Sequence, residues 1–283
     1  MSVTSQSTNT TTAAASDEAI LELFERLAIK AGRAIMEVYD SHIEVTEKSD
    51  ASPVTQADKA AEKVILAGLR AALPSIPCVS EEEIEEGIVP PDLGSLFLLV
   101  DPLDGTKEFV KRRTDFTVNI ALIRDGVPAI GVVYAPCSGR FFAGRPGRAE
   151  AFEVMDGVPT GRHQIHVREG REPLTIVASR SHLTPETEAF IKSVHAAEIV
   201  SVGSSLKFCL LATGEADLYP RFGRTMEWDT AAGDAVLRAA GGTTHTLDGA
   251  PLVYGKRNQA DDADFANPHF VSSGRIVDPG FIF

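Results

Sequence analysis

Hydrophobic positions recur at helical spacing in the first part of the chain. From residue 16 onwards apolar side chains return every three or four positions, and Ser16 followed by two acids is typical of a helix start. The apolar positions are Ile20, Leu21, Phe24, Leu27, Ala28, Ala31 and Ile35. This pattern predicts an amphipathic helix that ends near Tyr39. A second helix is predicted from near Thr55 to just before Pro74.

The middle of the chain changes to short apolar runs separated by turns. These runs are "PCVS", "LFLLV", "FTVNIALIRDG", "VPAIGVVYAP", "GRFFAG" and "AEAFEV". Two of them meet at "DG", which is a strong signal for a β-hairpin. We therefore expect a β-rich middle that forms an antiparallel meander.

Beyond residue 170 the pattern predicts alternating strands and helices. The expected order is "LTIVAS", a helix from Pro185, "IVSVG", a helix from Ser205 to Ala212, "ADLYP" and a helix from Asp229 to Ala240. Such alternation is typical of α/β folds. The polar segment "VREGREP" lies between the two patterns and predicts a domain boundary near residues 165 to 172.

The predicted fold class is therefore α/β, in two parts. An α+β N-terminal domain is expected over residues 16–168, and an α/β C-terminal domain over residues 169–283. Residues 1–15 are rich in Ser, Thr and Ala and lack the basic and apolar regions of a secretory signal, so we expect a flexible tail.

Composition and charge narrow the classes of function. No apolar run approaches the roughly 20 residues of a membrane-spanning helix. Three widely spaced cysteines, Cys78, Cys137 and Cys209, argue against a disulfide framework and favour a reducing cytoplasm. With 27 basic and 40 acidic residues, the net charge of −13 disfavours nucleic-acid binding. A phosphate-bearing ligand must therefore be held locally, by basic side chains, helix N-termini or metal ions.

The stretch "LFLLVDPLDGTKEF" carries the most specific chemistry. A buried strand would deliver Asp101 and Asp104 to the rim of a sheet, where ligands bind in α/β folds. Pro102 would end that strand, Gly105 would allow a tight turn, and "GTKEFVKR" would start a helix whose free N–H groups face an anion. Two carboxylates, a turn carbonyl and a helix N-terminus together suit Mg²⁺ bound to a phosphate.

This stretch has two alternative interpretations. "DG" is common in ordinary turns, in which case both acids would be solvated. The aspartyl-phosphate phosphatases have the signature DxDGT, with the first Asp as nucleophile. Here the spacing is DxxDGT, and the extra residue would move Asp101 away from the nucleophile position.

Three further motifs each have a plain alternative. "CVSEEE" brings Glu81 and Glu82 to the end of a strand, although acidic clusters are often solvated loops. In "WDTAAGDAVLRAAGG", Asp229 heads a helix and needs no role beyond that of an N-cap. In "SPVTQAD", Thr55 and Asp58 have the spacing of a capping box.

Taken together and in this order, the four motifs resemble those of the inositol monophosphatase superfamily of Mg²⁺-dependent, lithium-sensitive phosphatases. Within it, "DPLDGTKEFV" and "VGSSLKFCLLATGEADLYPRFGRTMEWDTAAGDAVL" are similar to the CysQ branch of 3'(2'),5'-bisphosphate nucleotidases. The resemblance covers nearly the whole chain after the tail. It implies a layered αβαβα sandwich of the inositol monophosphatase and fructose-1,6-bisphosphatase type.

The resemblance also implies a role for each matching position. Two or three Mg²⁺ ions would be held by Glu81, Asp101, the Leu103 carbonyl, Asp104 and Asp229. The catalytic residues, which orient the attacking water, would be Asp58, Glu82 and Thr106. The substrate would contact Glu81, Leu103, Asp104, Gly105, Thr106, Ser205, Lys207, Arg221 and Asp229, with N–H groups of Gly105 and Thr106 facing the scissile phosphate.

A few basic residues are candidates for substrate choice. Lys207 follows Ser204 and Ser205 at the head of an expected helix, and Arg221 and Arg224 precede "EWD". These cations would suit the second phosphate of a nucleotide bisphosphate, or they are ordinary surface cations.

By resemblance, we expect hydrolysis of the 3'-phosphate of adenosine 3',5'-bisphosphate in sulfate assimilation, which yields AMP and phosphate. A further expected substrate is 3'-phosphoadenosine 5'-phosphosulfate (PAPS). The alternatives are an inositol monophosphatase or sugar phosphatase and, in another class, a non-catalytic nucleotide- or phosphate-binding protein. The expected location is the cytoplasm, and the second option is peripheral association with the cytoplasmic face of the inner membrane. The family allows a homodimer.

Overall fold

The computed structural model describes residues 15–40, 45–47, 53–170, 173–179, 184–194 and 198–275. The expected tail over residues 1–15 lies outside these ranges except for residue 15. Within the described ranges, none of the helices is both long enough and apolar enough to cross a bilayer.

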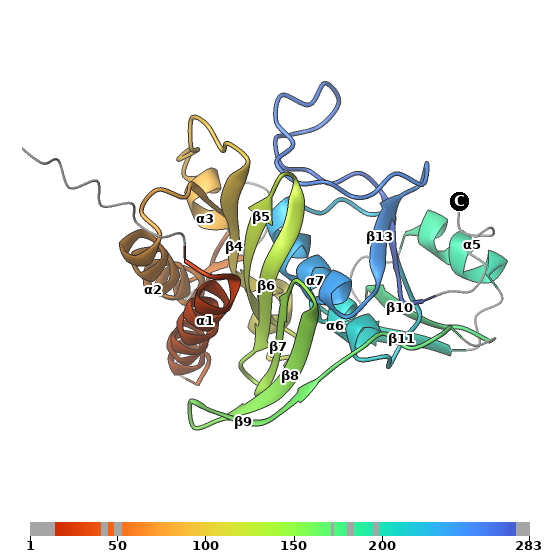
Figure 1. The fold of residues 1–283 in the computed structure, drawn as a ribbon, viewed down its shortest axis with the longest axis horizontal. Helices are drawn as coiled ribbons and strands as arrows, with labels where there is room; N and C mark the ends of the chain where they lie inside the picture. Colours follow the sequence, from red (N-terminus) through yellow and green to blue (C-terminus); the bar gives the residue numbers. More distant parts are fainter. Residues whose placement is uncertain are drawn as a thin grey trace, which may run out of the picture.

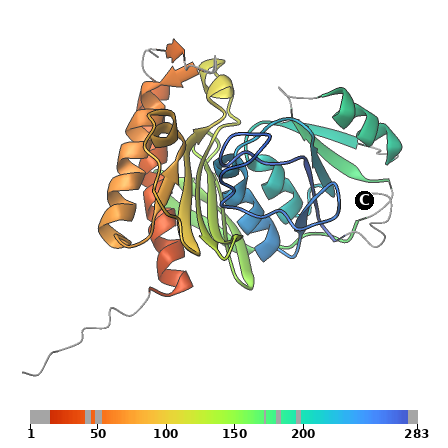
Figure 2. The same cartoon turned by 90° about the horizontal axis from the view of Figure 1, so that it is seen from above.

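Five layers of helices and sheets build the molecule (Figures 1 and 2). Helices α1 (Asp17–Tyr39) and α2 (Gln56–Ala72) form the first layer and cover one face of a seven-stranded sheet. Helices α6 (Leu206–Ala212) and α7 (Glu227–Ala239) lie between that sheet and a five-stranded one. Helix α5 (Pro185–Ser193) covers the outer side of the smaller sheet. This αβαβα order confirms the predicted fold class.

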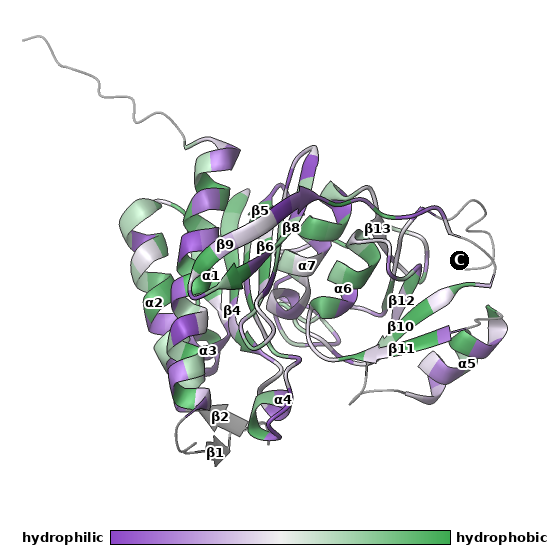
Figure 3. Cartoon of the chain, turned by 90° about the horizontal axis from the view of Figure 1, so that it is seen from below, coloured by the Kyte–Doolittle hydropathy of each residue, from purple (hydrophilic) through white to green (hydrophobic). Residues whose placement is uncertain are grey.

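Both helices of the first layer begin and pack as their sequence predicts. The Ser16 hydroxyl caps α1 by accepting a hydrogen bond from the Ala19 N–H at 3.2 Å. Hydrophobic and hydrophilic positions alternate around α1 and α2 (Figure 3), and the apolar positions predicted for α1 are all buried. The packed apolar faces hold both helices against the large sheet.

The seven-stranded sheet has the order β3-β4-β5-β6-β7-β8-β9, in which only β3 and β4 pair in parallel. Its strands are β3 (Cys78–Ser80), β4 (Leu96–Asp104), β5 (Thr117–Arg124), β6 (Val127–Ala135), β7 (Arg140–Arg145), β8 (Arg148–Met155) and β9 (Val158–Gln164). The meander prediction is therefore confirmed. Strand β9 was not predicted, because all of its residues are exposed and they show no apolar alternation.

The five-stranded sheet has the order β11-β10-β12-β14-β13. Its strands are β10 (Thr175–Ser179), β11 (Glu198–Val202), β12 (Leu218–Arg221), β13 (Thr243–Thr246) and β14 (Phe270–Ser273). Short elements complete the fold: β1 (Val45–Glu47), β2 (Pro53–Thr55), α3 (Glu81–Glu85) and α4 (Thr106–Val110).

The chain passes from one sheet to the other between Gln164 and Thr175, where the sequence changes pattern. The main hydrophobic core nevertheless crosses this point, since Phe97 of the large sheet belongs to the same cluster as Phe208 and Phe270. The division into two domains stays a proposal, and any such domains share one core.

Helix α7 packs directly against two glycines of the large sheet. A Cβ atom on Gly131 would lie 2.6 Å from the Ala232 carbonyl oxygen, and one on Gly144 would lie 2.7 Å from the Val236 Cα atom. Real Cβ atoms do not come this close to backbone, so only glycine allows the observed separation.

We therefore expect Gly131→Ala to push α7 off the sheet and to lower the free energy of unfolding by about 1–3 kcal/mol, the usual cost of overpacking. Urea unfolding measures this. Gly274→Ala is the matched control, because its Cβ would meet nothing closer than 3.4 Å. Equal losses in both variants would contradict the close-contact explanation.

Candidate active site

A cavity of about 270 Å³ opens where the end of β4, the start of α4, the turn before α6 and the start of α7 meet. Of the residues predicted for the site, those that line it are Glu81, Asp101, Leu103, Asp104, Gly105, Thr106, Ser205, Lys207, Arg221 and Asp229. The other two predicted residues, Asp58 and Glu82, are buried outside its wall. Asp58 is nevertheless near enough to raise the pKa of Asp101 electrostatically.

A β-bulge in β4 places both aspartates of "DPLD" on one side of the sheet. Asp101 pairs with Asn119 of β5 and Asp104 with Thr117, so three steps on one strand oppose two on the other. Residues three apart in a regular strand face opposite sides, and the extra residue corrects this. The prediction that Pro102 ends the strand is wrong, because a bulge tolerates its missing N–H and β4 continues to Asp104.

Asp104 ties the two parts of the site together. Its Oδ2 atom accepts hydrogen bonds from the Ser204 hydroxyl and the Ser205 N–H, each at 2.7 Å. The Ser205 hydroxyl donates to the Asp229 carbonyl oxygen at 2.6 Å and accepts from the Asn119 side-chain amide at 2.9 Å. Ser204 has a φ of 54°, a left-handed conformation that turns its side chain and the next N–H toward one carboxylate.

The carboxylates of the cavity repel one another. Asp101 is 1% exposed, and burial together with Glu81, Asp104 and Asp229 raises its pKa well above the ordinary value. Burial and Asp104 raise the pKa of Asp229 to about 7. A divalent cation would relieve both effects, so the donor chemistry fits a hard, oxygen-liganded ion.

These acids line an open cavity and do not form a closed cage. Within the ranges that the structure describes, no three His, Cys, Asp or Glu side chains are grouped so that they could hold an ion by themselves. Mg²⁺ sites in proteins usually include water and substrate phosphate beside the carboxylates. The Leu103 carbonyl as a ligand stays a prediction.

The "SEEE" segment is held from helix α2. Its acids begin α3, which is a short helix and not the loop of the alternative interpretation. Glu62 of α2 accepts from the Ser80 hydroxyl at 2.5 Å and from the Glu83 N–H at 3.3 Å, and Arg70 binds both Glu83 carboxylate oxygens at 2.6 and 2.7 Å. These two contacts hold Ser80 and Glu83, the residues on either side of Glu81 and Glu82.

Sequence reasoning missed Glu62 and Asn119. Glu62 lies one helical turn after Asp58 on the same side of α2, and that spacing was the available signal. Asn119 is the single amide in the apolar run of β5, where a buried polar residue needs a partner.

Gly105 is the N-cap of α4 and forms the predicted tight turn. Its φ of +94° lies in the region that favours glycine, and a Cβ there would be 3.1 Å from the Asp115 carbonyl oxygen. Thr106 is the first residue of α4 and lines the cavity. Phosphate binding by these two N–H groups stays a prediction.

Two of the three candidate cations are buried in the cavity wall. Lys207 is 5% exposed, donates to the Ser204 carbonyl and has its Nζ atom 5.5 Å from the Tyr219 ring centre. Burial lowers its pKa to about 8. Arg221 is 8% exposed and donates to the carbonyls of Gly223 and Arg224. Lys207 and Arg221 are thus not surface cations, whereas Arg224 is exposed and pairs with Asp262 at 3.3 Å.

Asp229 lies in the first turn of α7, not at its N-cap. The helix begins at Glu227 with Met226 as N-cap, so the predicted start was two residues late. One Asp229 carboxylate oxygen accepts from the Met226 N–H at 2.8 Å. The capping box proposed for Thr55 and Asp58 lies outside the described residues, because the Thr55 side chain is not among them.

Comparisons with known proteins agree on one family. A profile described as the inositol monophosphatase family matches residues 16–269. The 3'(2'),5'-bisphosphate nucleotidase CysQ of Escherichia coli O6:H1 is 49% identical over 247 residues, 87% of this chain and 96% of the relative. Its counterpart in Buchnera aphidicola is 40% identical over 256 residues, 90% and 93% of the two chains.

Solved structures give the same result. The crystal structure of CysQ from Bacteroides thetaiotaomicron, described as a bacterial member of the inositol monophosphatase family, has a TM-score of 0.74 at 35% identity and covers 90% of this chain and 97% of that one. An IMPase from Thermotoga maritima has a TM-score of 0.73 at 23% identity, covers 93% of this chain and 95% of its own, and shows the shared fold.

The contacts of Glu62 predict its effect on cation binding. Glu62→Ala removes the acceptor that holds Ser80 and Glu83, so we expect Mg²⁺, used as the test ion in calorimetry, to bind roughly tenfold more weakly. Glu62→Gln keeps an acceptor and should bind nearly as the unchanged protein does. Glu86→Ala, which breaks only the exposed Lys59–Glu86 pair, is the control. If Glu62→Ala and Glu86→Ala bind Mg²⁺ equally well, Glu62 does not hold the site.

The raised pKa of Asp229 predicts a pH dependence of stability. A folded-state pKa near 7 favours the protonated form, so this group stabilises the metal-free protein at low pH and loses that effect as pH rises from about 4 through 7. In EDTA, stability relative to Asp229→Asn should therefore fall by roughly 2–4 kcal/mol between pH 4.5 and 8. Urea unfolding measures the difference, and parallel pH curves for the two proteins would refute it.

Proposed function

Because this chain belongs to the inositol monophosphatase family, we propose that its cavity is the active site of a 3'(2'),5'-bisphosphate nucleotidase. The substrate we propose is adenosine 3',5'-bisphosphate, whose 3'-phosphate is hydrolysed to leave AMP. The observation that carries the proposal is that acids and two buried cations line one cavity. The acids suit metal ions on the reacting phosphate, and the cations suit the second phosphate.

The cation ligands we propose are Glu81, Asp101, the Leu103 carbonyl, Asp104 and Asp229. Bound Mg²⁺, as two or three ions, would polarise the phosphoryl group, promote deprotonation of water and neutralise the charge that develops on the leaving oxygen. Asp104 is already oriented for this role, since the Ser204 and Ser205 contacts hold one of its oxygens in place.

The chain itself would orient the reacting groups. We assign Asp58, Glu82 and Thr106 to positioning the attacking water, and the N–H groups of Gly105 and Thr106 to the scissile phosphate. The left-handed turn at Gly105 supports this, because it brings the start of α4 to the cavity wall.

Ser205, Lys207 and Arg221 would recognise the second phosphate. Lys207 keeps its charge at neutral pH even with a pKa near 8, and a bound dianion would raise that pKa further. This favours a bisphosphate over inositol monophosphate or a sugar phosphate, which offer no second anion. PAPS carries the same 3'-phosphate and is proposed as a further substrate.

The described cysteines are free thiols, in keeping with the cytoplasmic location we propose. The partner would be a small phosphorylated nucleotide. A homodimer and association with a membrane surface remain predictions.

Substrate preference tests the proposal directly. With Mg²⁺ present, we expect kcat/KM on adenosine 3',5'-bisphosphate to exceed that on inositol 1-phosphate by about a hundredfold, the value of one or two charge-assisted contacts. Lys207→Met should lower the first figure and leave the second nearly unchanged. A preference for the inositol ester would overturn the nucleotidase assignment.

Asp101→Asn separates catalysis from binding alone. The variant should bind adenosine 3',5'-bisphosphate in calorimetry without hydrolysing it. If the unchanged protein also binds the nucleotide without turnover, the non-catalytic alternative is correct.

A further inference from the structure

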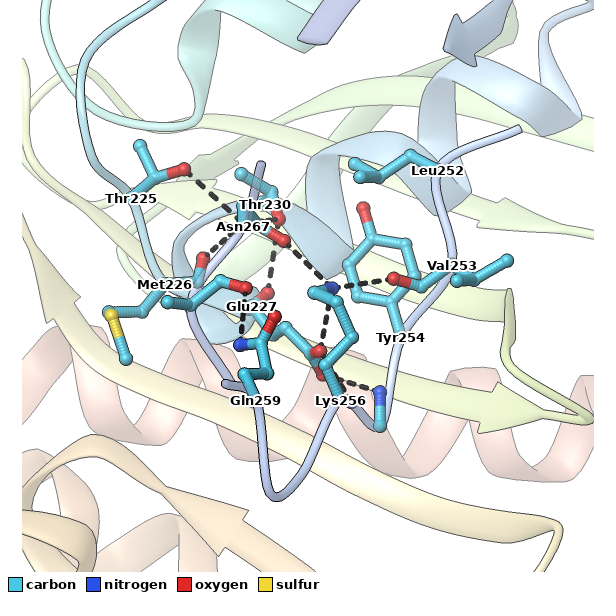
Figure 4. Close-up of polar contacts among 12 residues, drawn as sticks. Thr225, Met226, Glu227, Thr230, Leu252, Val253, Tyr254, Lys256, Gln259 and Asn267 are labelled. Carbon is cyan, nitrogen blue, oxygen red and sulfur yellow. Dashed lines mark hydrogen bonds and ion pairs between the residues drawn. The ribbon is translucent and has the colours of Figure 1, made fainter. Parts of the chain in front are cut away.

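The segment from Val253 to Asn267 crosses the start of α7 and is fastened there by polar contacts (Figure 4). Glu227 is fully buried, and its carboxylate accepts from the N–H groups of Gly255 and Lys256 at 2.6 and 2.9 Å. A carboxylate in such a place is costly unless it is paired and hydrogen-bonded. This acid has both kinds of partner.

Lys256 is the centre of the arrangement. Its ammonium group lies 2.7 Å from Glu227 Oε1, 3.2 Å from Asn267 Oδ1 and 2.6 Å from the Val253 carbonyl oxygen (Figure 4). An ammonium has three donors, and each has an acceptor here. All three donors of the ammonium group are therefore hydrogen-bonded in this one arrangement.

Asn267 connects this ion pair to the residues before α7. Its side-chain amide donates to the Met226 carbonyl at 2.8 Å and lies 3.0 Å from the Thr230 hydroxyl, while its own N–H donates to the Thr225 carbonyl. The Glu227 N–H donates in turn to the Phe265 carbonyl. The first residues of α7 and its N-cap are thus hydrogen-bonded to both Phe265 and Asn267 of the crossing segment.

A second attachment lies two helical turns further along α7. Tyr254 donates to the buried Asp234 at 3.0 Å, and Arg238 contacts the same carboxylate at 2.9 Å. Glu227 and Asp234 are seven residues apart and therefore share one side of the helix. The crossing segment is fixed at both points, which leaves little freedom at the start of α7.

We infer that Glu227, Lys256 and Asn267, which we call the clasp, are positioning residues for the cation site of the proposed function. Their effect passes through Met226, whose carbonyl is held by Asn267 and whose N–H is bound by the Asp229 carboxylate. Asp229 is also the neighbour of Trp228 in the same cavity wall. The clasp itself lines none of that cavity, so it acts by fixing Asp229 and not by contact with the ligand.

The test uses two variants of the full chain, Lys256→Met and Asn267→Asp. Loss of a partner that orients a metal ligand costs roughly 10- to 100-fold in metal affinity, so we expect Mg²⁺ to bind at least about tenfold more weakly in calorimetry without substrate. Trp228, the single tryptophan of the sequence, is 5% exposed and lies in the first turn of α7, so its fluorescence is a probe of that turn. Its metal-free emission should shift to longer wavelength in both variants.

Lys192→Met is the matched control, because this exposed lysine lies on α5 away from the cavity. It should leave Mg²⁺ affinity and Trp228 emission unchanged. A lower melting temperature with unchanged Mg²⁺ affinity in both clasp variants would show a purely structural role and overturn the inference. In that case hydrolysis by the unchanged protein would still support the proposed function, whereas failure of the unchanged protein to bind Mg²⁺ would overturn both.

Discussion

Several carboxylates line one cavity, and their mutual repulsion is the constraint that the surrounding structure satisfies. Burial and this repulsion together raise the pKa values of Asp101 and Asp229. The fold compensates part of the cost with hydrogen bonds: Asp104 is held by the "GSS" turn and Asp229 by the Met226 N–H. These hydrogen bonds do not neutralise the negative charge of the carboxylates. An excess of negative charge favours bound cations over neutral ligands.

The same contacts explain why the site needs both sheets. The acids at the end of β4 come from the larger sheet, while Ser204, Ser205 and Asp229 come from segments next to the smaller one. Since Asp104 hydrogen-bonds directly to this second group, folding of the two parts is coupled at the site. A core that passes without interruption between the sheets strengthens the coupling.

Local patterns predicted most of the fold, and long-range contacts account for what they did not predict. Helix α1 and strands β4 to β8 follow from periodicity, because their apolar residues face a core. Strand β9 does not, since it pairs at an exposed edge without burying side chains. The acids near the ends of β3 and β4 were predictable, because each of these apolar runs is followed directly by acidic residues in the sequence. Glu62, Asn119 and the burial of Lys207 depend on which segments meet in space, and a single sequence does not contain that information.

The close contact between α7 and the glycines of β6 and β7 bears on how the enzyme we propose would release its products. Because α7 packs directly on β6 and β7, Asp229 at its start is placed relative to the same sheet that carries Asp101 and Asp104. Product release would then depend on side chains that line the cavity, the exposed Arg224 among them, more than on separation of α7 from the sheet.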